Sequence, residues 1–171
     1  MDTTTQEQLT TALATAFTRF STLLQSFSDE QINRSPFEGS WTPAQVATHI
    51  IKATDGIPDS RTQITDRPID AMLPMIRPWW EDLNQRFQSP DLLLPDNQTR
   101  TKDQLIAELN RVMQRDLAII TQTDLAALCM DFQLPQVGYL TRYEWLNFIE
   151  MHLNRHSAQL SRMKSHLATN K

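Results

Sequence analysis

Three histidines are the residues of this chain whose types and spacing could do chemistry. His152 and His156 lie four residues apart in the segment His-Leu-Asn-Arg-His, and His49 follows the sequence Trp-Thr-Pro by six residues. Residues four apart on an α-helix share one face, about 6 Å apart along the axis, so both imidazoles could reach one ion. A third imidazole on a facing helix would complete a set of three neutral nitrogen ligands. Such a set leaves a coordination position open, which is typical of a catalytic zinc-type centre.

Structural roles are the alternative for these histidines. A lone histidine on an apolar stripe is more often a hydrogen-bonded core residue, and His-x-x-x-His occurs by chance in many helices. Taken together, however, three imidazoles in one core would all need partners for their nitrogens. We therefore favour a metal triad of His49, His152 and His156. His166, near the C-terminal end of the sequence, is predicted to be solvated and not a ligand.

A bound ion would define the chemistry of such a site. The sequence contains no His-Glu-x-x-His, so the general base of many zinc proteases is missing from its usual place. Three imidazoles would still lower the pKa of a bound water toward neutrality, or ionise a coordinated thiol. The metal-bound water or thiol is thus the only catalytic group that we assign. Ligating imidazoles usually donate their other N–H to an acceptor, for which the candidates are Gln45, Asn147, Glu150 and Asp116.

Several other residues could line the site or serve the fold. Trp41 is expected to pack over the helix start that follows it, although it could also line a pocket. Trp79 and Trp80 diverge by about 100° on a helix, so one of them could contact substrate or a second subunit. Cys129 lies between apolar residues, which favours an inert buried thiol. Arg155 is expected to point to solvent or pair with an acid, and at the rim of a pocket it could hold an anionic substrate.

Four amphipathic helices are expected to position these residues, because apolar residues recur at three- and four-residue spacing in four segments. The first helix spans residues 5–27. The second starts with the capping box at Thr42, has proline at its first position, and carries an apolar stripe as far as Ile57. Capping boxes at Thr101 and Thr141 open the third and fourth helices. The histidines fall on the buried stripes of the second and fourth.

The segment between the second and third helices has a different character. Residues 55–100 contain six of the nine prolines and many turn-forming polar residues. A short helix over Pro78–Phe87 is expected to pack on the bundle there. This Pro-rich crossover is long enough to let the second and third helices run parallel. Since no strand pattern is convincing, we predict an all-α four-helix bundle with up-down-down-up topology.

Composition limits the class of protein. The 171 residues are expected to form a single domain, residues 1–171, with one buried core. A net charge of -4 gives no electrostatic footprint for nucleic acid, so we expect no such partner. Cys129 is the only cysteine, which excludes disulfides and cysteine-rich metal sites within one chain. No secretory signal or membrane span is recognisable, so we predict a cytoplasmic protein without membrane contact.

Four pieces of the sequence, in order along nearly the whole chain, resemble the DinB/YfiT-like family of metalloenzymes: Gly39–Ile50, Ser89-Pro90, Gly138–Thr141 and His152–Leu160. The first and last pieces are the specific ones. The resemblance implies a four-helix bundle whose metal ligands would be His49, His152 and His156, none of which is replaced here. It also implies a divalent ion, zinc or nickel, at one end of the bundle, often in a homodimer. Some relatives use low-molecular-weight thiols as co-substrates.

These observations lead to one functional hypothesis and one alternative from another class. The hypothesis is a metal-dependent enzyme with a three-histidine site, acting on a small molecule as a thiol-dependent S-transferase or as a hydrolase. The alternative is a non-catalytic helical bundle, stabilised by a metal or binding a ligand, that acts through protein contacts. The motivation for the alternative is that no acid or base residue can be assigned beside the triad.

Overall fold

The computed structural model describes residues 3–169. Within this range the chain forms five α-helices, one 3-10 helix and two short strands. In chain order they are α1 Thr3–Gln25, α2 Pro43–Thr54, β1 Thr62–Gln63, α3 Leu73–Glu81, η1 Asp91–Leu93, α4 Lys102–Gln122, β2 Leu128–Cys129 and α5 Arg142–Thr169.

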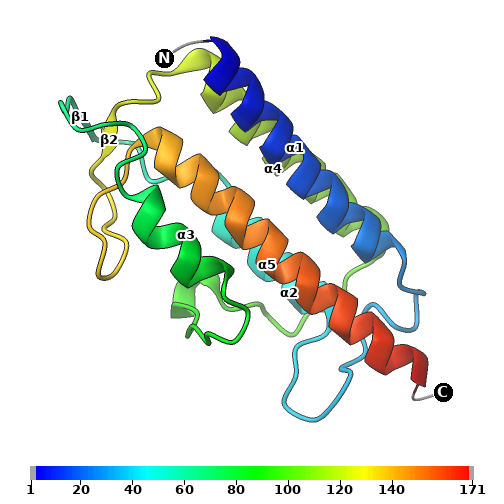
Figure 1. Ribbon diagram of the computed structural model, residues 1–171. Helices are drawn as coiled ribbons and strands as arrows, with labels where there is room; N and C mark the ends of the chain where they lie inside the picture. Colours follow the sequence, from blue (N-terminus) through cyan, green and yellow to red (C-terminus); the bar gives the residue numbers. More distant parts are fainter. Residues whose placement is uncertain (1–2, 170–171) are drawn as a thin grey trace.

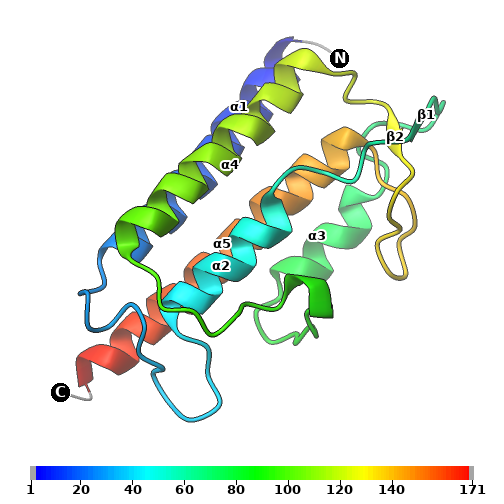
Figure 2. The same cartoon turned by 180° about the vertical axis from the view of Figure 1, so that it is seen from behind.

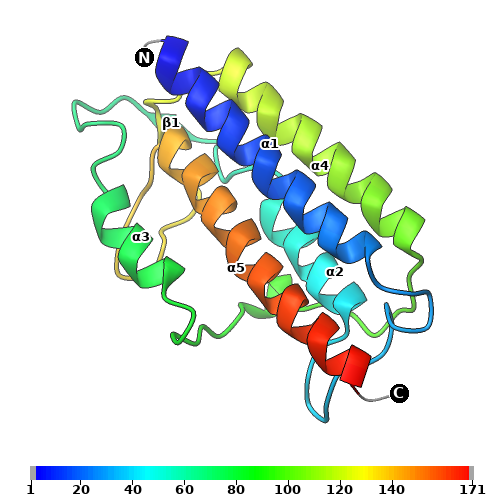
Figure 3. The same ribbon diagram turned by 45° about the vertical axis from the view of Figure 1, so that its right-hand side comes forward.

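Four of the helices pack against one another around a common core. Helix α1 contacts α4 and α5, and α2 contacts the same two helices, so that α1 and α2 lie diagonally across the bundle. Helix α3 packs on the outside of α5 (Figures 1 and 3). The prediction of a mostly helical protein built on four packed helices is therefore confirmed. Among the described helices, none has both the length and the apolar character needed to cross a membrane.

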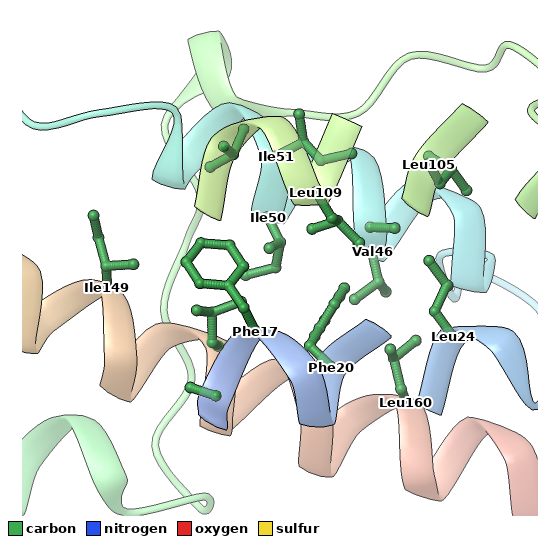
Figure 4. Packing of buried hydrophobic residues seen from close by; sticks show 14 of the residues in the cluster. Phe17, Phe20, Leu24, Val46, Ile50, Ile51, Leu105, Leu109, Ile149 and Leu160 are labelled. Atoms are coloured by element: carbon green, nitrogen blue, oxygen red, sulfur yellow. The ribbon is translucent and has the colours of Figure 1, made fainter. Parts of the chain in front are cut away.

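The core is filled by apolar stripes with helical spacing. Phe17 and Phe20 of α1 are almost completely buried and point toward Ile50 of α2 and Leu109 of α4 (Figure 4). Burying one such phenylalanine stabilises the fold by roughly 1.5–3 kcal/mol. The stripes that the sequence predicted are thus the surfaces that hold the four helices together, and they fix the side of α2 and α5 that faces inward.

The helix starts follow local chemistry. The hydroxyl of Thr42 accepts a hydrogen bond from the amide of Gln45 at 3.1 Å, and the Gln45 side chain accepts one from the Thr42 amide at 3.0 Å. The same reciprocal pair forms at Thr101. At the start of α5, the Glu144 carboxylate accepts from the amide of Thr141 at 2.8 Å, and the Thr141 hydroxyl accepts in return. All three predicted capping boxes are confirmed.

Three predicted boundaries were wrong. The first helix covers Thr3–Gln25 rather than residues 5–27. The apolar stripe to Ile57 overran α2, which ends at Thr54, because Gly56 adopts a φ of 88° that terminates helices. The short helix expected over Pro78–Phe87 is α3, Leu73–Glu81.

The α3 boundary has a physical cause. Pro74 occupies the first turn, where a missing N–H leaves no hydrogen bond unmade, and Pro78 lies inside the helix. Burial of Ile76 against the second core cluster, which includes residues of α5, outweighs the hydrogen bond that Pro78 cannot donate.

A small sheet was not expected from the sequence. Strands β1 and β2 pair antiparallel, with Thr62 opposite Cys129 and Gln63 opposite Leu128. Each strand has two residues, which is too short for a period-two pattern to be recognisable. The pairing ties the segment after α2 to the connection between α4 and α5.

Candidate metal centre

The structure brings together the three histidines that the sequence singled out. Helix α2 supplies His49, and α5 supplies His152 and His156. One nitrogen of each ring lies within 4.8 Å of one nitrogen of each of the others. The ring centroids are 4.8–5.2 Å apart, and His49 and His152 are buried.

The helices explain this convergence. The capping box at Thr42 fixes the start of α2, and His49 then falls on its buried face beside Val46 and Ile50. On α5 the four-residue spacing places His152 and His156 one turn apart on the same face. Because α2 and α5 pack against each other, the two faces meet.

Hydrogen bonds determine which nitrogen of two rings is available. Nδ1 of His49 lies 3.0 Å from the carbonyl oxygen of Leu93 in η1. A carbonyl can only accept, so Nδ1 carries the proton and Nε2 carries a lone pair. In the same way, Nδ1 of His156 donates to Oε1 of Gln159 at 2.7 Å. In both rings the outer hydrogen bond uses Nδ1, so the lone pair of Nε2 is available to bind a cation. Histidines that bind metals are usually oriented in this way.

The distance between two rings also suits a cation. Nε2 of His49 and Nε2 of His152 are 3.1 Å apart. Two nitrogens bonded to one tetrahedral zinc at about 2.0–2.1 Å are separated by about 3.3 Å. A hydrogen bond from His152 to His49 would give a similar distance in the metal-free protein. His49 and His152 therefore have the spacing of two ligands of one divalent ion, and His156 lies beside them in the same cluster.

Burial keeps these imidazoles neutral. It is the largest cause that lowers the pKa of His49, where the Leu93 carbonyl opposes it. Burial, followed by the neighbouring His156 and His49, lowers the pKa of His152 well below its usual value. The pKa of His156 falls to about 3, first through burial and then through His49. Neutral imidazole is the form that binds a metal, so the site is ready for a cation at neutral pH.

Aromatic side chains enclose the histidines. The ring of Trp41 lies 5.3 Å from that of His49, and the ring of Trp80 lies 5.4 Å from that of His152. Phe87 stacks on Trp80 with centroids 4.4 Å apart. Trp41 also packs against the main core, as the sequence predicted. These rings make the surroundings of the nitrogen cluster less polar, which strengthens its electrostatic interactions.

Trp79 and Trp80 are both half-buried and both contact Phe87, and of the two it is Trp80 that also packs on Phe148 of α5. Cys129 is completely buried, and burial raises its pKa to about 12, which confirms the predicted inert thiol. His166 is exposed, against Phe37, and lies outside the cluster of three.

The expectation for Arg155 was wrong. Instead of pointing to solvent or pairing with an acid, its guanidinium donates to the backbone carbonyls of Trp80, Asp82 and Gln85. It also lies 4.8 Å from the ring centroid of Phe87. The chain leaving α3 offers carbonyls that no helix partner satisfies, and the fork of an arginine is suited to bind several of them.

The expected acceptors for the histidines have other roles. Gln45 completes the Thr42 capping box, and Asn147 donates to the Tyr143 carbonyl. Glu150 accepts from Asn154, and Asp116 is buried on α4.

Their place is taken by Gln159 and by the carbonyl of Leu93. Gln159 could have been found, because it lies three residues after His156 on one helix face. A backbone carbonyl carries no residue-specific signal in the sequence.

The comparisons with known proteins agree with this fold. A model of the DinB superfamily matches residues 12–160. The uncharacterised protein YuaE of Bacillus subtilis (strain 168) is 25% identical over 142 residues, covering 82% of this chain and 88% of YuaE.

Two solved structures share the fold. YfiT from Bacillus subtilis, described as a probable metal-dependent hydrolase with an unusual four-helix bundle topology, superimposes with a TM-score of 0.61 at 16% identity, over 98% of this chain and 90% of its own. The colibactin self-resistance protein ClbS, solved in complex with double-stranded DNA, gives 0.52 at 14% identity, over 93% and 94%. The family match spans most of the sequence and includes all three histidines, so the chain belongs to the DinB superfamily.

Proposed function

We propose that this protein is a metal-dependent enzyme in which His49, His152 and His156 hold one divalent ion. One observation carries the proposal: three imidazoles converge, two of them buried, and outer hydrogen bonds orient the rings of His49 and His156 so that Nε2 of each faces the cluster. The description of YfiT as a metal-dependent hydrolase is consistent with this assignment. The reaction that we infer is hydrolysis of a small molecule, or transfer of a group to a low-molecular-weight thiol.

Each part of the site has a definite task in this proposal. When bound, a divalent ion would supply Lewis-acid chemistry, which lets water or a thiol lose a proton near neutral pH. The Leu93 carbonyl and Gln159 hold two of the rings in the required tautomer. Trp41 and Trp80 keep bulk water away from the nitrogens. No side chain is assigned as a general acid or base.

Zinc and nickel are the proposed ions. Imidazole ligands suit both metals, and the absence of carboxylates from the cluster of described ligand residues argues against magnesium and calcium, which prefer oxygen.

We further propose a single domain over residues 1–171, an up-down-down-up order of the four packed helices, a homodimer and a cytoplasmic location. The pairing of α2 with α4 and the long crossover between them support the helix order.

Nucleic acid remains an alternative partner, because ClbS was solved with double-stranded DNA. We propose a small-molecule substrate instead, since a chain of net charge -4 lacks the basic surface that neutralises phosphates. Fluorescence anisotropy with a duplex at low salt decides between them. Binding that weakens steeply with added salt would replace our proposal, and no change in anisotropy would agree with it.

The metal content is measured on untagged protein, because a polyhistidine tag would itself bind nickel or zinc. Elemental analysis should find about one zinc or nickel per chain in the wild type, and none in the His49→Ala, His152→Ala, His156→Ala triple variant. His166→Ala, which removes the exposed histidine outside the cluster, should keep the metal. Equal metal content in the triple variant and the wild type would end the proposal.

A structural ion is the competing function. It would contribute strongly to folding free energy, so its removal by a chelator should lower the melting temperature steeply. In an enzyme with a large apolar core, chelation should instead abolish hydrolase or thiol-transfer activity while moving the melting temperature only slightly. Panels of ester and thiol substrates, run before and after chelation, separate the two roles.

A further inference from the structure

The segment that follows α3 lies against the histidine cluster. Residues 82–97, here called the strap, leave the end of α3 and pass along α2 on the way to α4 (Figure 2). Every residue of the strap is at least partly exposed, and Leu92 is 87% exposed. No strap residue lies in the core, so polar contacts and the packing of Phe87 on Trp79 and Trp80 hold the strap in place.

The first half of the strap is held by one side chain. Nη1 of Arg155 donates to the carbonyls of Trp80 and Asp82 at 2.9 Å each, and Nη2 donates to the carbonyl of Gln85. The guanidinium also lies over Phe87. These carbonyls close the C-terminal end of α3, where orphan acceptors need donors and arginine is a favourable one.

The second half of the strap rests on α2. The Leu93 carbonyl accepts from Nδ1 of His49 at 3.0 Å, and the Leu94 carbonyl accepts from Nζ of Lys52 at 2.7 Å. Oδ1 of Asn97 accepts from the side chain of Gln45 at 3.1 Å. The contact that orients His49 is thus made by the strap itself.

We propose that the strap is a gate over the metal centre and that Arg155 is its latch. The inference rests on the proposed metal site and adds to it the control of access. His49 and His152 are only 4% and 7% exposed, so an ion or substrate needs an opening. Segments with few buried apolar contacts open locally at a small fraction of the global unfolding free energy. Arg155 lies between His152 and His156 in the sequence of α5. When its hydrogen bonds to the three carbonyls break, the first half of the strap can move away from the site on the side next to Trp80.

The proposal is tested with Arg155→Met, which keeps length and packing but removes the donors, and with Arg155→Lys, which keeps the charge but not the fork. The exposed Arg162→Met, two turns further along α5, is the matched control. Hydrogen exchange of the amides of Gln85, Leu93 and Leu94, which bond within the strap, is followed in metal-free protein. The rate of zinc removal by an excess of chelator is followed in loaded protein.

We expect Arg155→Met to speed strap exchange and zinc removal by about tenfold or more, as loss of charge-assisted hydrogen bonds implies. Arg155→Lys should show a smaller acceleration, and Arg162→Met none; exchange in α1 should stay unchanged throughout. If the strap amides of a folded Arg155→Met protein exchange at the wild-type rate, Arg155 is not the latch. If Arg155→Met does not fold, unaltered strap exchange in Arg155→Lys would overturn it equally. Since the exchange measurement needs no metal, it stands even if elemental analysis refutes the metal site.

Discussion

Replacing Asp116 by asparagine should stabilise the protein by an amount that grows with pH. Asp116 lies on the buried stripe of α4 and is 0% exposed, and no described residue gives either carboxylate oxygen a hydrogen bond of ordinary geometry. Burial raises its pKa to about 8, opposed only weakly by the nearby Gly56 amide and Arg115. At neutral pH the folded protein therefore holds a proton that the unfolded chain has lost.

The sign and size of the effect follow from this difference. Between the ordinary pKa of 3.8 and the folded value of about 8, the folded state binds more protons, so stability present at low pH is lost as the pH rises. One pH unit within this window corresponds to about 1.36 kcal/mol. The stability difference between Asp116→Asn and wild type should accordingly widen by about 2.7 kcal/mol between pH 5 and pH 7. The histidines titrate equally in both proteins, so their contribution cancels.

The assay is urea denaturation of metal-free protein, monitored by circular dichroism at pH 5, 6 and 7. Asp103→Asn, on the exposed face at the start of the same helix, is the control and should not reproduce the widening. A difference that stays constant across the three pH values, or shrinks with rising pH, would refute the argument that Asp116 is buried with its proton.

Two further predictions concern contacts around the site. Gln159→Leu removes the acceptor of His156 Nδ1 and should weaken zinc affinity by roughly 10–100-fold in a chelator competition titration, whereas Gln159→Glu should not; equal affinities would mean that another group orients the ring. Glu144→Gln removes the charge that faces Arg67 beneath the start of α5 and should lower the free energy of unfolding by about 3 kcal/mol, as for a broken buried pair. A loss below about 1 kcal/mol in urea denaturation would contradict that estimate.

The parts of the fold that the sequence predicts are those governed by local chemistry. The capping boxes at Thr42, Thr101 and Thr141 are complete within four residues, so the starts of α2, α4 and α5 could be predicted. The shared face of His152 and His156 follows from helical periodicity alone.

The parts that could not be predicted depend on where distant segments meet. Nothing in the sequence marks the Leu93 carbonyl as the partner of His49, because every residue carries the same acceptor. Arg155 could have bound an acid, and only the path of the chain after α3 places backbone carbonyls in its reach. The start of α3 was missed because burial of Ile76 decides it, and burial is a tertiary property.

The chemistry of the ligands bears on whether folding needs the metal. Burial raises the pKa of Asp116 to about 8, because an apolar interior penalises a buried charge. If the triad consisted of carboxylates or thiolates, burying their charges in the metal-free protein would carry the same free-energy cost. Imidazoles avoid it, since burial only holds them in the neutral form. With Leu93 and Gln159 accepting the outer protons, the bundle can assemble before a cation arrives. An ion that is not needed for folding is free to exchange ligands, which is what an enzyme requires of it.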